Sequence, residues 1–182
     1  MKNKYSLLFL FAAFCCLGVQ CKEEEPDKID ELAKLPPATT KGRNTFGCLI
    51  NGKAFPYGAP GEHIKLAYYD NGEFYVSYKT RLNPFSPVIE SGVTLFVTNK
   101  ITSEGTFFIN PIDDQDHFTV IWNDKFFASK YSLKPEDKIA KIVITRFDTI
   151  NHVLSGNFSF KAKTIQGEEE VVIEHGRFDF QY

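Results

Sequence analysis

The amino-acid sequence predicts an all-β fold, a single antiparallel β-sandwich or barrel of about ten to twelve short strands. Aromatic residues make up 15% of the chain and include 18 Phe, and aromatic and β-branched residues favour strands over helices. Apolar and polar residues alternate in short runs, as expected for strands with one buried face. Turn-forming residues such as Asn51-Gly52 separate these runs, so neighbouring strands are expected to pair as hairpins.

The predicted strands follow one another with short connections. Pro84 and Pro87 predict a loop over residues 81–90, because proline disrupts strand pairing. Gly156 predicts a β-bulge near the start of one of the two longest strands. The strands are expected at residues 45–50, 53–57, 63–69, 73–80, 93–98, 106–110, 117–123, 125–129, 140–147, 154–163, 170–174 and 177–182.

Residues 1–20 have the pattern of an export signal. Lys2 and Lys4 form a short basic start, and an apolar stretch from Ser6 to Gly18 follows. This stretch is too short to span a bilayer as a permanent helix, so the segment is interpreted as a cleaved signal peptide.

Cys21 is the predicted lipidation site. It ends the run Leu17-Gly18-Val19-Gln20-Cys21, which resembles a lipobox, the site where a bacterial lipoprotein is acylated on Cys and cut before it. Gln20 departs from the small residue usual at that position. Cys16 is the rival site, but two apolar residues follow it instead of a polar tether. Several acyl chains on Cys21 would hold the protein on a membrane, since one chain alone binds marginally.

Residues 21–43 are predicted to form the acylated Cys and a flexible tether, because they bury too little apolar surface to offset the entropy of ordering. Only residues 29–35 are expected to form a helical turn. The run directly after Cys21 resembles the lipoprotein export signal of Bacteroidota, which routes a lipoprotein to the outer face of the outer membrane. The alternatives are an ordinary charged linker and attachment facing the periplasm. The export-type run consists of Lys22, Glu23, Glu24 and Glu25.

The domain over residues 44–182 resembles a known family at both ends. Residues 44–55, which read NTFGCLINGKAF, follow the leader LPPAT at residues 35–39. The sequence LSGNFSF at residues 154–160 precedes GRFD at residues 176–179. Together these stretches resemble a family of small Bacteroidota lipoproteins that is catalogued as a domain of unknown function. Ala54-Phe55 is a mild departure, since it stands where an aromatic residue such as Trp is often found. The resemblance implies an envelope location and this fold, and it implies no catalytic residues.

The charge distribution argues against nucleic acid as a partner. The whole chain has a formal charge of −2, and removal of Lys2 and Lys4 with the signal makes it −4. Residues 22–34 hold three Lys and six acids, so the β domain is nearly neutral. Nucleic-acid binding needs a basic stripe, and no such stripe is evident in the sequence.

Cysteine and histidine usage predicts neither a disulfide nor a metal site in the β domain. Cys48 is the single cysteine within residues 44–182, and a buried small hydrophobe is favoured over a reactive thiol. The four histidines lack the short spacing of metal ligands. Residues 113–116, which read DDQD, lack the pattern of a calcium loop and are interpreted as a solvated loop.

No catalytic or cofactor-binding motif is recognisable, so no catalytic residue and no cofactor are assigned. Tyr68, Tyr75 and Trp122 are the candidate ligand platform, because aromatic rings can stack on sugars. The alternative is that these aromatic side chains belong to the core or form cross-strand pairs.

The sequence therefore predicts a lipoprotein anchored to the outer membrane, exposed on the cell surface, that acts as a non-enzymatic binding or accessory module. Its expected partners are the membrane, through the lipid anchor, and an extracellular glycan or an envelope protein. The first alternative is a carbohydrate-processing or other hydrolase with an unrecognised site, and the second is a structural envelope lipoprotein.

Overall fold

The computed structural model describes residues 30–56, 61–70, 72–81, 83, 85, 88–98, 101–110, 116–132, 134, 136 and 139–182. The predicted signal peptide, Cys21 and the export-type run from Lys22 to Glu25 lie outside these residues. The elements are the 3₁₀ helices η1 (Glu31–Lys34) and η2 (Ser129–Tyr131) and the strands β1 (Thr45–Ile50), β2 (Lys53–Phe55), β3 (Glu62–Asp70), β4 (Glu73–Arg81), β5 (Ser91–Thr98), β6 (Gly105–Ile109), β7 (His117–Trp122), β8 (Lys125–Ala128), β9 (Ala140–Asp148), β10 (Val153–Lys163) and β11 (Glu170–Gln181).

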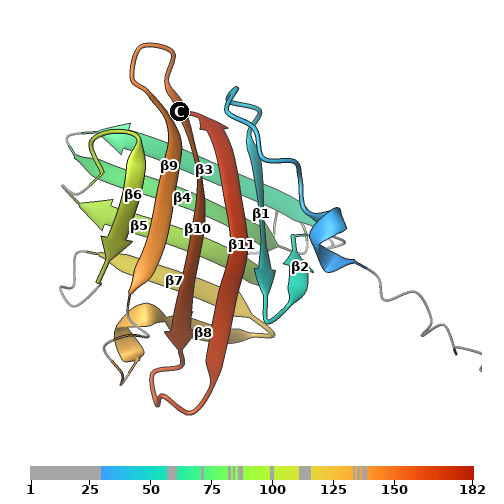
Figure 1. Cartoon of the computed structure of the whole chain (residues 1–182). Coiled ribbons are helices and arrows are strands. Elements are labelled where there is room, and N and C mark those ends of the chain that lie inside the picture. Colours follow the sequence, from blue (N-terminus) through green and yellow to red (C-terminus); the bar gives the residue numbers. More distant parts are fainter. Residues whose placement is uncertain are drawn as a thin grey trace, which may run out of the picture.

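The prediction of an all-β antiparallel fold is confirmed. Eleven strands form one sheet in the order β2-β1-β11-β10-β8-β7-β5-β4-β3, with β9 beside β10 and β6 beside β9. The long strand β10 pairs with β9 over residues 153–159 and with β8 at Lys163, so the sheet divides there into two layers. The layer of β6, β9, β10, β11, β1 and β2 crosses the layer of β8, β7, β5, β4 and β3 steeply (Figure 1). The described strands do not close into a barrel, and the fold is sandwich-like.

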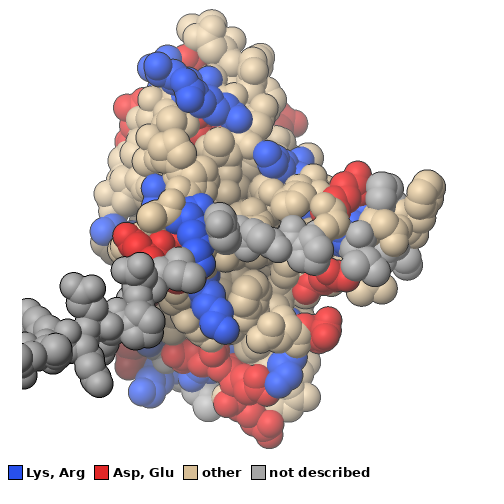
Figure 2. Space-filling model, turned by 90° about the vertical axis from the view of Figure 1, so that its right-hand side faces the viewer, with Lys and Arg blue, Asp and Glu red and all other residues tan. Residues whose placement is uncertain are grey.

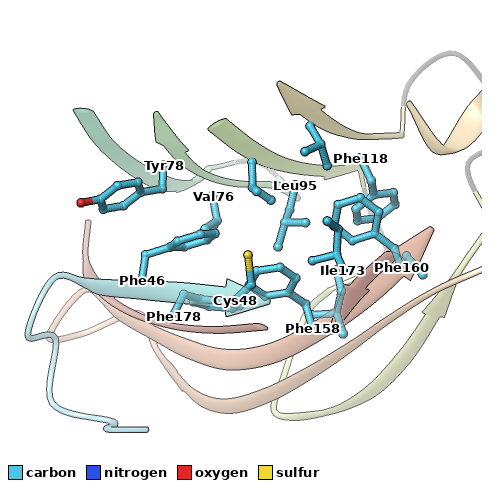
Figure 3. Close-up of a cluster of buried hydrophobic side chains, with 14 of the residues drawn as sticks. Phe46, Cys48, Val76, Tyr78, Leu95, Phe118, Phe158, Phe160, Ile173 and Phe178 are labelled. Carbon is cyan, nitrogen blue, oxygen red and sulfur yellow. The ribbon is translucent and has the colours of Figure 1, made fainter. Parts of the chain in front are cut away.

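The core lies between the two layers. Figure 3 shows side chains from β1, β10 and β11 meeting side chains from β4, β5 and β7. Alternation along each strand places them there, for example on β4, where Phe74, Val76 and Tyr78 are all buried. Phe rings dominate this core, with contacts such as Phe46 with Phe158 at 5.4 Å between ring centroids.

The local sequence signals locate most strands to within two residues. At the first hairpin Asn51 and Gly52 have φ angles of 48° and 77°, as the type I′ turn requires. A bulge is present beside Gly156, but the extra residue is Thr145 of β9 and not a residue of β10, because the consecutive residues Ser155 and Gly156 lie opposite Arg146 and Ile144. A Cβ at Gly156 would lie 2.4 Å from the Val143 carbonyl oxygen, so close strand approach requires glycine here.

The two strands predicted at residues 170–174 and 177–182 are in fact one, β11. His175 has a φ angle of 51°, and the β10–β11 register shifts between Phe158 and Phe160, which marks a bulge inside β11. The extra residue reverses the alternation, so that Ile173 before the bulge and Phe178 after it both point into the core. The sequence alternation changes phase at this bulge, which is why the strand does not follow one pattern of alternation along its length.

Residues 30–43, predicted to belong to the flexible tether, instead pack on the β domain. We call this segment the N-terminal strap. It contains η1, within the predicted helical turn, and the Glu31 carboxylate accepts a hydrogen bond of 2.8 Å from the Ala54 amide. Leu35 is buried against Leu49 and Ala54 on the outer face of β1 and β2. Apolar side chains of the strap are thus buried against the outer face of the β domain, a contact that the sequence alone did not predict.

Over the part of the chain that the structure describes, no helix has both the length and the apolar character needed to cross a membrane.

Candidate functional site: a cationic groove beside the N-terminal strap

A groove of about 350 Å³ lies on the outer face of β9, β10 and β11, the strands at the front of Figure 1. Lys141 of β9, Asn157 and Ser159 of β10, and His175 and Arg177 of β11 provide its polar lining. The groove is shallow, because the Phe158 ring beneath the strands fills the core at this point and is almost fully buried.

Strand pairing and the β11 bulge bring these side chains together. Asn157 lies directly opposite Arg177, and Ser159 lies directly opposite Lys141, so all four point to the same outer face. Without the extra residue at His175, the two-residue alternation that buries Ile173 would turn Arg177 into the core. The bulge therefore creates the cationic groove.

The groove carries positive charge with no acid among its lining residues. Within the described part of the chain, no ion pair or hydrogen bond engages the side chain of Lys141 or Arg177. The basic residues further along β10 differ, since Lys163 lies 3.4 Å from the Glu170 carboxylate. Two positively charged side chains that have no ion-pair partner among the described residues and lie in one open groove can bind an anionic group through charge-assisted hydrogen bonds.

A second hollow of about 110 Å³ continues the groove along the N-terminal strap. It shares Ala38, Asn157 and Arg177 with the groove. Its other polar lining consists of hydroxyl-bearing side chains, namely Thr39, Thr40, Thr45 and Thr145. Cationic groups thus adjoin neutral hydrogen-bonding groups along one continuous surface.

The strap lines one side of the smaller hollow, and Asp179 holds the strap in this position. Its side chain is almost fully buried and accepts hydrogen bonds from the Ser155 and Thr39 hydroxyls and from the backbone amides of Lys41, Gly42 and Arg43. Burial of the carboxyl raises its pKa, but the bonds from Ser155, Thr39 and the backbone outweigh burial and lower the pKa to about 2. The Asp179 carboxylate is therefore ionised in the folded protein, and it holds the strap against β11 through hydrogen bonds.

The predicted aromatic platform is only partly assembled. Tyr68 and Tyr75 lie opposite each other on β3 and β4, with ring centroids 5.1 Å apart and planes at 7°. Trp122 points to the other face of this layer, where it packs on Phe55 at 6.2 Å. The three residues thus do not form one surface, and Tyr68 and Tyr75 cover a face of each other's rings.

The tyrosine pair belongs to a longer aromatic row that sequence reasoning missed. Tyr75 lies opposite Phe96 on β5, and Phe96 lies opposite His117 on β7, with ring centroids 4.8 Å apart. The strand order was the missing information, since the sequence does not show that β7 follows β5 in the sheet. This row is a set of cross-strand pairs, which was the alternative interpretation of Tyr68 and Tyr75.

The other candidate residues have structural surroundings. Burial raises the pKa of the Cys48 thiol, which is completely inaccessible and has no role at the groove. The prediction of a solvated loop at residues 113–116 is wrong for Asp116, which is buried and accepts a hydrogen bond of 2.9 Å from the Thr98 amide. Residues 113–115 lie outside the described residues. No group of three or more His, Cys, Asp and Glu suited to a metal ion occurs among the residues with described positions.

The surface seen from the side of η1 and β2 carries basic and acidic side chains together, with uncharged residues between them (Figure 2). This mixture on the visible face agrees with the nearly neutral composition of the domain.

Comparisons of the chain with protein-family models, with curated proteins and with solved structures found no match.

Proposed function

We propose that the protein is an outer-membrane lipoprotein, anchored through Cys21 and exposed at the cell surface, whose β domain acts as a non-enzymatic binding module. The anchor and the surface location rest on the lipobox-like sequence, on the export-type run from Lys22 to Glu25 and on the family resemblance. The partner is an extracellular glycan or an envelope protein.

The observation that carries the binding role is the groove with Lys141 and Arg177. Their charges are not neutralised by described protein groups, whereas the two buried carboxylates of the described domain, Asp116 and Asp179, are both engaged in structural hydrogen bonds. Two cations in a groove that no described carboxylate lines suit recognition of an anion better than glycoside hydrolysis, which needs a pair of positioned carboxyl groups.

The anchor is tested by expressing the full chain in a bacterium of the same envelope type. Mass spectrometry of the N-terminal peptide is expected to show acylated Cys21, and protease treatment of intact cells is expected to remove the β domain. Cys21→Ala should abolish acylation and release the protein from the outer-membrane fraction. Acylation at Cys16, or acylation at Cys21 with full protection from protease, would contradict the anchor site or the surface location respectively.

The hydrolase alternative is tested on the same purified chain. Incubation with panels of glycans and peptides is expected to leave them intact. Turnover of any substrate that a single carboxylate substitution abolishes would replace the binding role with the hydrolase.

A further inference from the structure

The cationic groove and the threonine-lined hollow form a continuous surface with two kinds of chemistry. Arg177 belongs to both, with Lys141 and His175 on one side and Thr39, Thr40, Thr45 and Thr145 on the other. A ligand that satisfies both sides needs an anionic group next to several hydroxyl groups.

We propose that this surface binds an acidic saccharide whose carboxylate lies between Lys141 and Arg177 and whose hydroxyls extend toward the strap. The guanidinium of Arg177 offers parallel N–H donors that match a carboxylate, and the Lys141 ammonium adds a second charge. Asn157 can donate and accept, as sugar hydroxyls do, and it stands directly opposite Arg177 at the junction of the two hollows.

The two cations of the surface favour a polar, anionic ligand over an apolar one. The groove, of about 350 Å³, lies at the lower end of the range of small-molecule sites, and the hollow adds about 110 Å³ to it. Apolar side chains also line the surface, namely Ala38, Val143 and Phe158 in the groove and Pro37 and Phe178 in the hollow. An apolar ligand would leave Arg177 and Lys141 covered without a hydrogen-bond partner, which is unfavourable.

The strap completes the site. Ala38 lines both hollows, and Thr39 donates its hydroxyl hydrogen to Asp179 while also lining the smaller hollow. The Asp179 carboxylate is the acid nearest to Arg177 along the outer face of β11, but it is buried and faces five donors from Ser155 and the strap. The ligand therefore meets the cations and not this acid.

This inference rests on the proposed binding role but not on the lipid anchor. It is tested on the full chain with Cys21→Ser, by isothermal titration with trigalacturonate as the acidic probe and maltotriose as the neutral one. Binding of trigalacturonate and not of maltotriose is expected. Arg177→Ala and Lys141→Ala should each weaken binding about tenfold, as for loss of one charge-assisted hydrogen bond. Arg177→Lys should also weaken it, because Lys lacks the planar fork.

Two matched variants separate the site from general surface charge. Lys125→Ala removes a lysine from another hollow, of about 410 Å³, where Lys125 lies 2.5 Å from Glu169, and binding should not change. Thr145→Val keeps the shape of an exposed side chain but removes its hydroxyl, so it should weaken trigalacturonate binding and not acetate binding. Circular dichroism of each variant checks that the fold is retained.

Several outcomes would overturn the proposal. These are equal binding of maltotriose, unchanged affinity in the double variant of Lys141 and Arg177, and no binding detectable at a dissociation constant of about 1 mM. Binding of inorganic phosphate as tight as that of trigalacturonate would show a simple oxyanion site, and tighter binding of a tetra-aspartate peptide would show a peptide site. If trigalacturonate binds but Cys21 is not acylated, the anchor fails and the groove stands. If Cys21 is acylated and no probe binds, the groove fails and the anchor stands.

Discussion

The Ser155 hydroxyl donates a hydrogen bond of 2.6 Å to the Asp179 carboxylate across the paired strands β10 and β11. The same carboxylate accepts bonds from Thr39, Lys41, Gly42 and Arg43 of the strap. A sheet residue near the end of the chain thus fixes a segment more than a hundred residues earlier in the sequence. Since the strap also walls the smaller hollow, this carboxylate links domain stability to the shape of the candidate site.

Substitution of Asp179 is expected to release the strap. Asp179→Ala leaves buried donors without an acceptor, and the free energy of unfolding should fall by about 3 kcal/mol. Ser155→Ala removes one donor and should cost about 1 kcal/mol. Hydrogen exchange followed by mass spectrometry is expected to show faster exchange at residues 39–43 in both variants, and denaturant unfolding measures the energies. Unchanged exchange in Asp179→Ala would show that the strap is held by other contacts.

Acid should weaken the domain through the same carboxylate. The pKa of Asp179 is lowered from 3.8 to about 2 in the folded protein, so the ionised form stabilises the fold above about pH 4. This contribution, on the order of 2 kcal/mol, is lost as the pH falls from about 4 to about 2. Urea unfolding at several pH values measures the slope. Asp179→Asn should flatten this slope, whereas Glu168→Gln, at an exposed acid, should keep it.

Gly176 is expected to tolerate no side chain while Phe158 lies beneath it. A Cβ at Gly176 would lie 2.5 Å from Cε2 of the Phe158 ring. Gly176→Ala should therefore destabilise the domain by about 1–3 kcal/mol through overpacking. Phe158→Leu in the same chain should make Gly176→Ala less costly, as two residues in contact do not act additively. Equal costs of Gly176→Ala in both backgrounds would contradict the steric explanation.

Cys48 should react only in the unfolded protein. Its side chain is completely buried in the core, and burial raises the pKa of the thiol. Iodoacetamide at pH 8 is expected to leave Cys48 unmodified in the native chain and to modify it in denaturant, as read by peptide mass spectrometry. The thiolate is the reactive form, and both access and ionisation are missing in the fold. Rapid native labelling of the Cys48 peptide would show an opening of the β1–β4 side of the core.

Tyr68 and Tyr75 should be coupled energetically, whereas Tyr75 and Trp122 should not. The tyrosine rings stack at 5.1 Å, while Trp122 packs on Phe55 on the other face of the layer. A double-mutant cycle with Leu at both tyrosine positions is expected to give about 0.5–1.5 kcal/mol of coupling in unfolding experiments. The cycle of Tyr75 with Trp122 is its control, with a coupling near zero. Comparable coupling in both cycles would mean that the three aromatic side chains act as one cluster.

The sequence by itself determined most of the strands and the first hairpin turn, and it indicated a bulge beside Gly156. These features depend on neighbours along the chain, namely the two-residue alternation and the positive φ angles that Asn51 and Gly52 supply. The sequence also indicates the signal and the acylated Cys21, which remain predictions.

Only the tertiary structure decided which outward side chains meet. Lys141, Asn157 and Arg177 lie on three strands, and their proximity depends on the strand order and on the phase change at His175. The tertiary structure also placed Trp122 on the other face of the layer from Tyr68 and Tyr75. It further showed that residues 30–43 pack on the outer face of the β domain. The physical reason is that the alternation along a strand fixes the face of the sheet to which each side chain points. Which strands become neighbours depends on how the whole core is buried. The same burial decides where a bulge reverses the face to which the following side chains point.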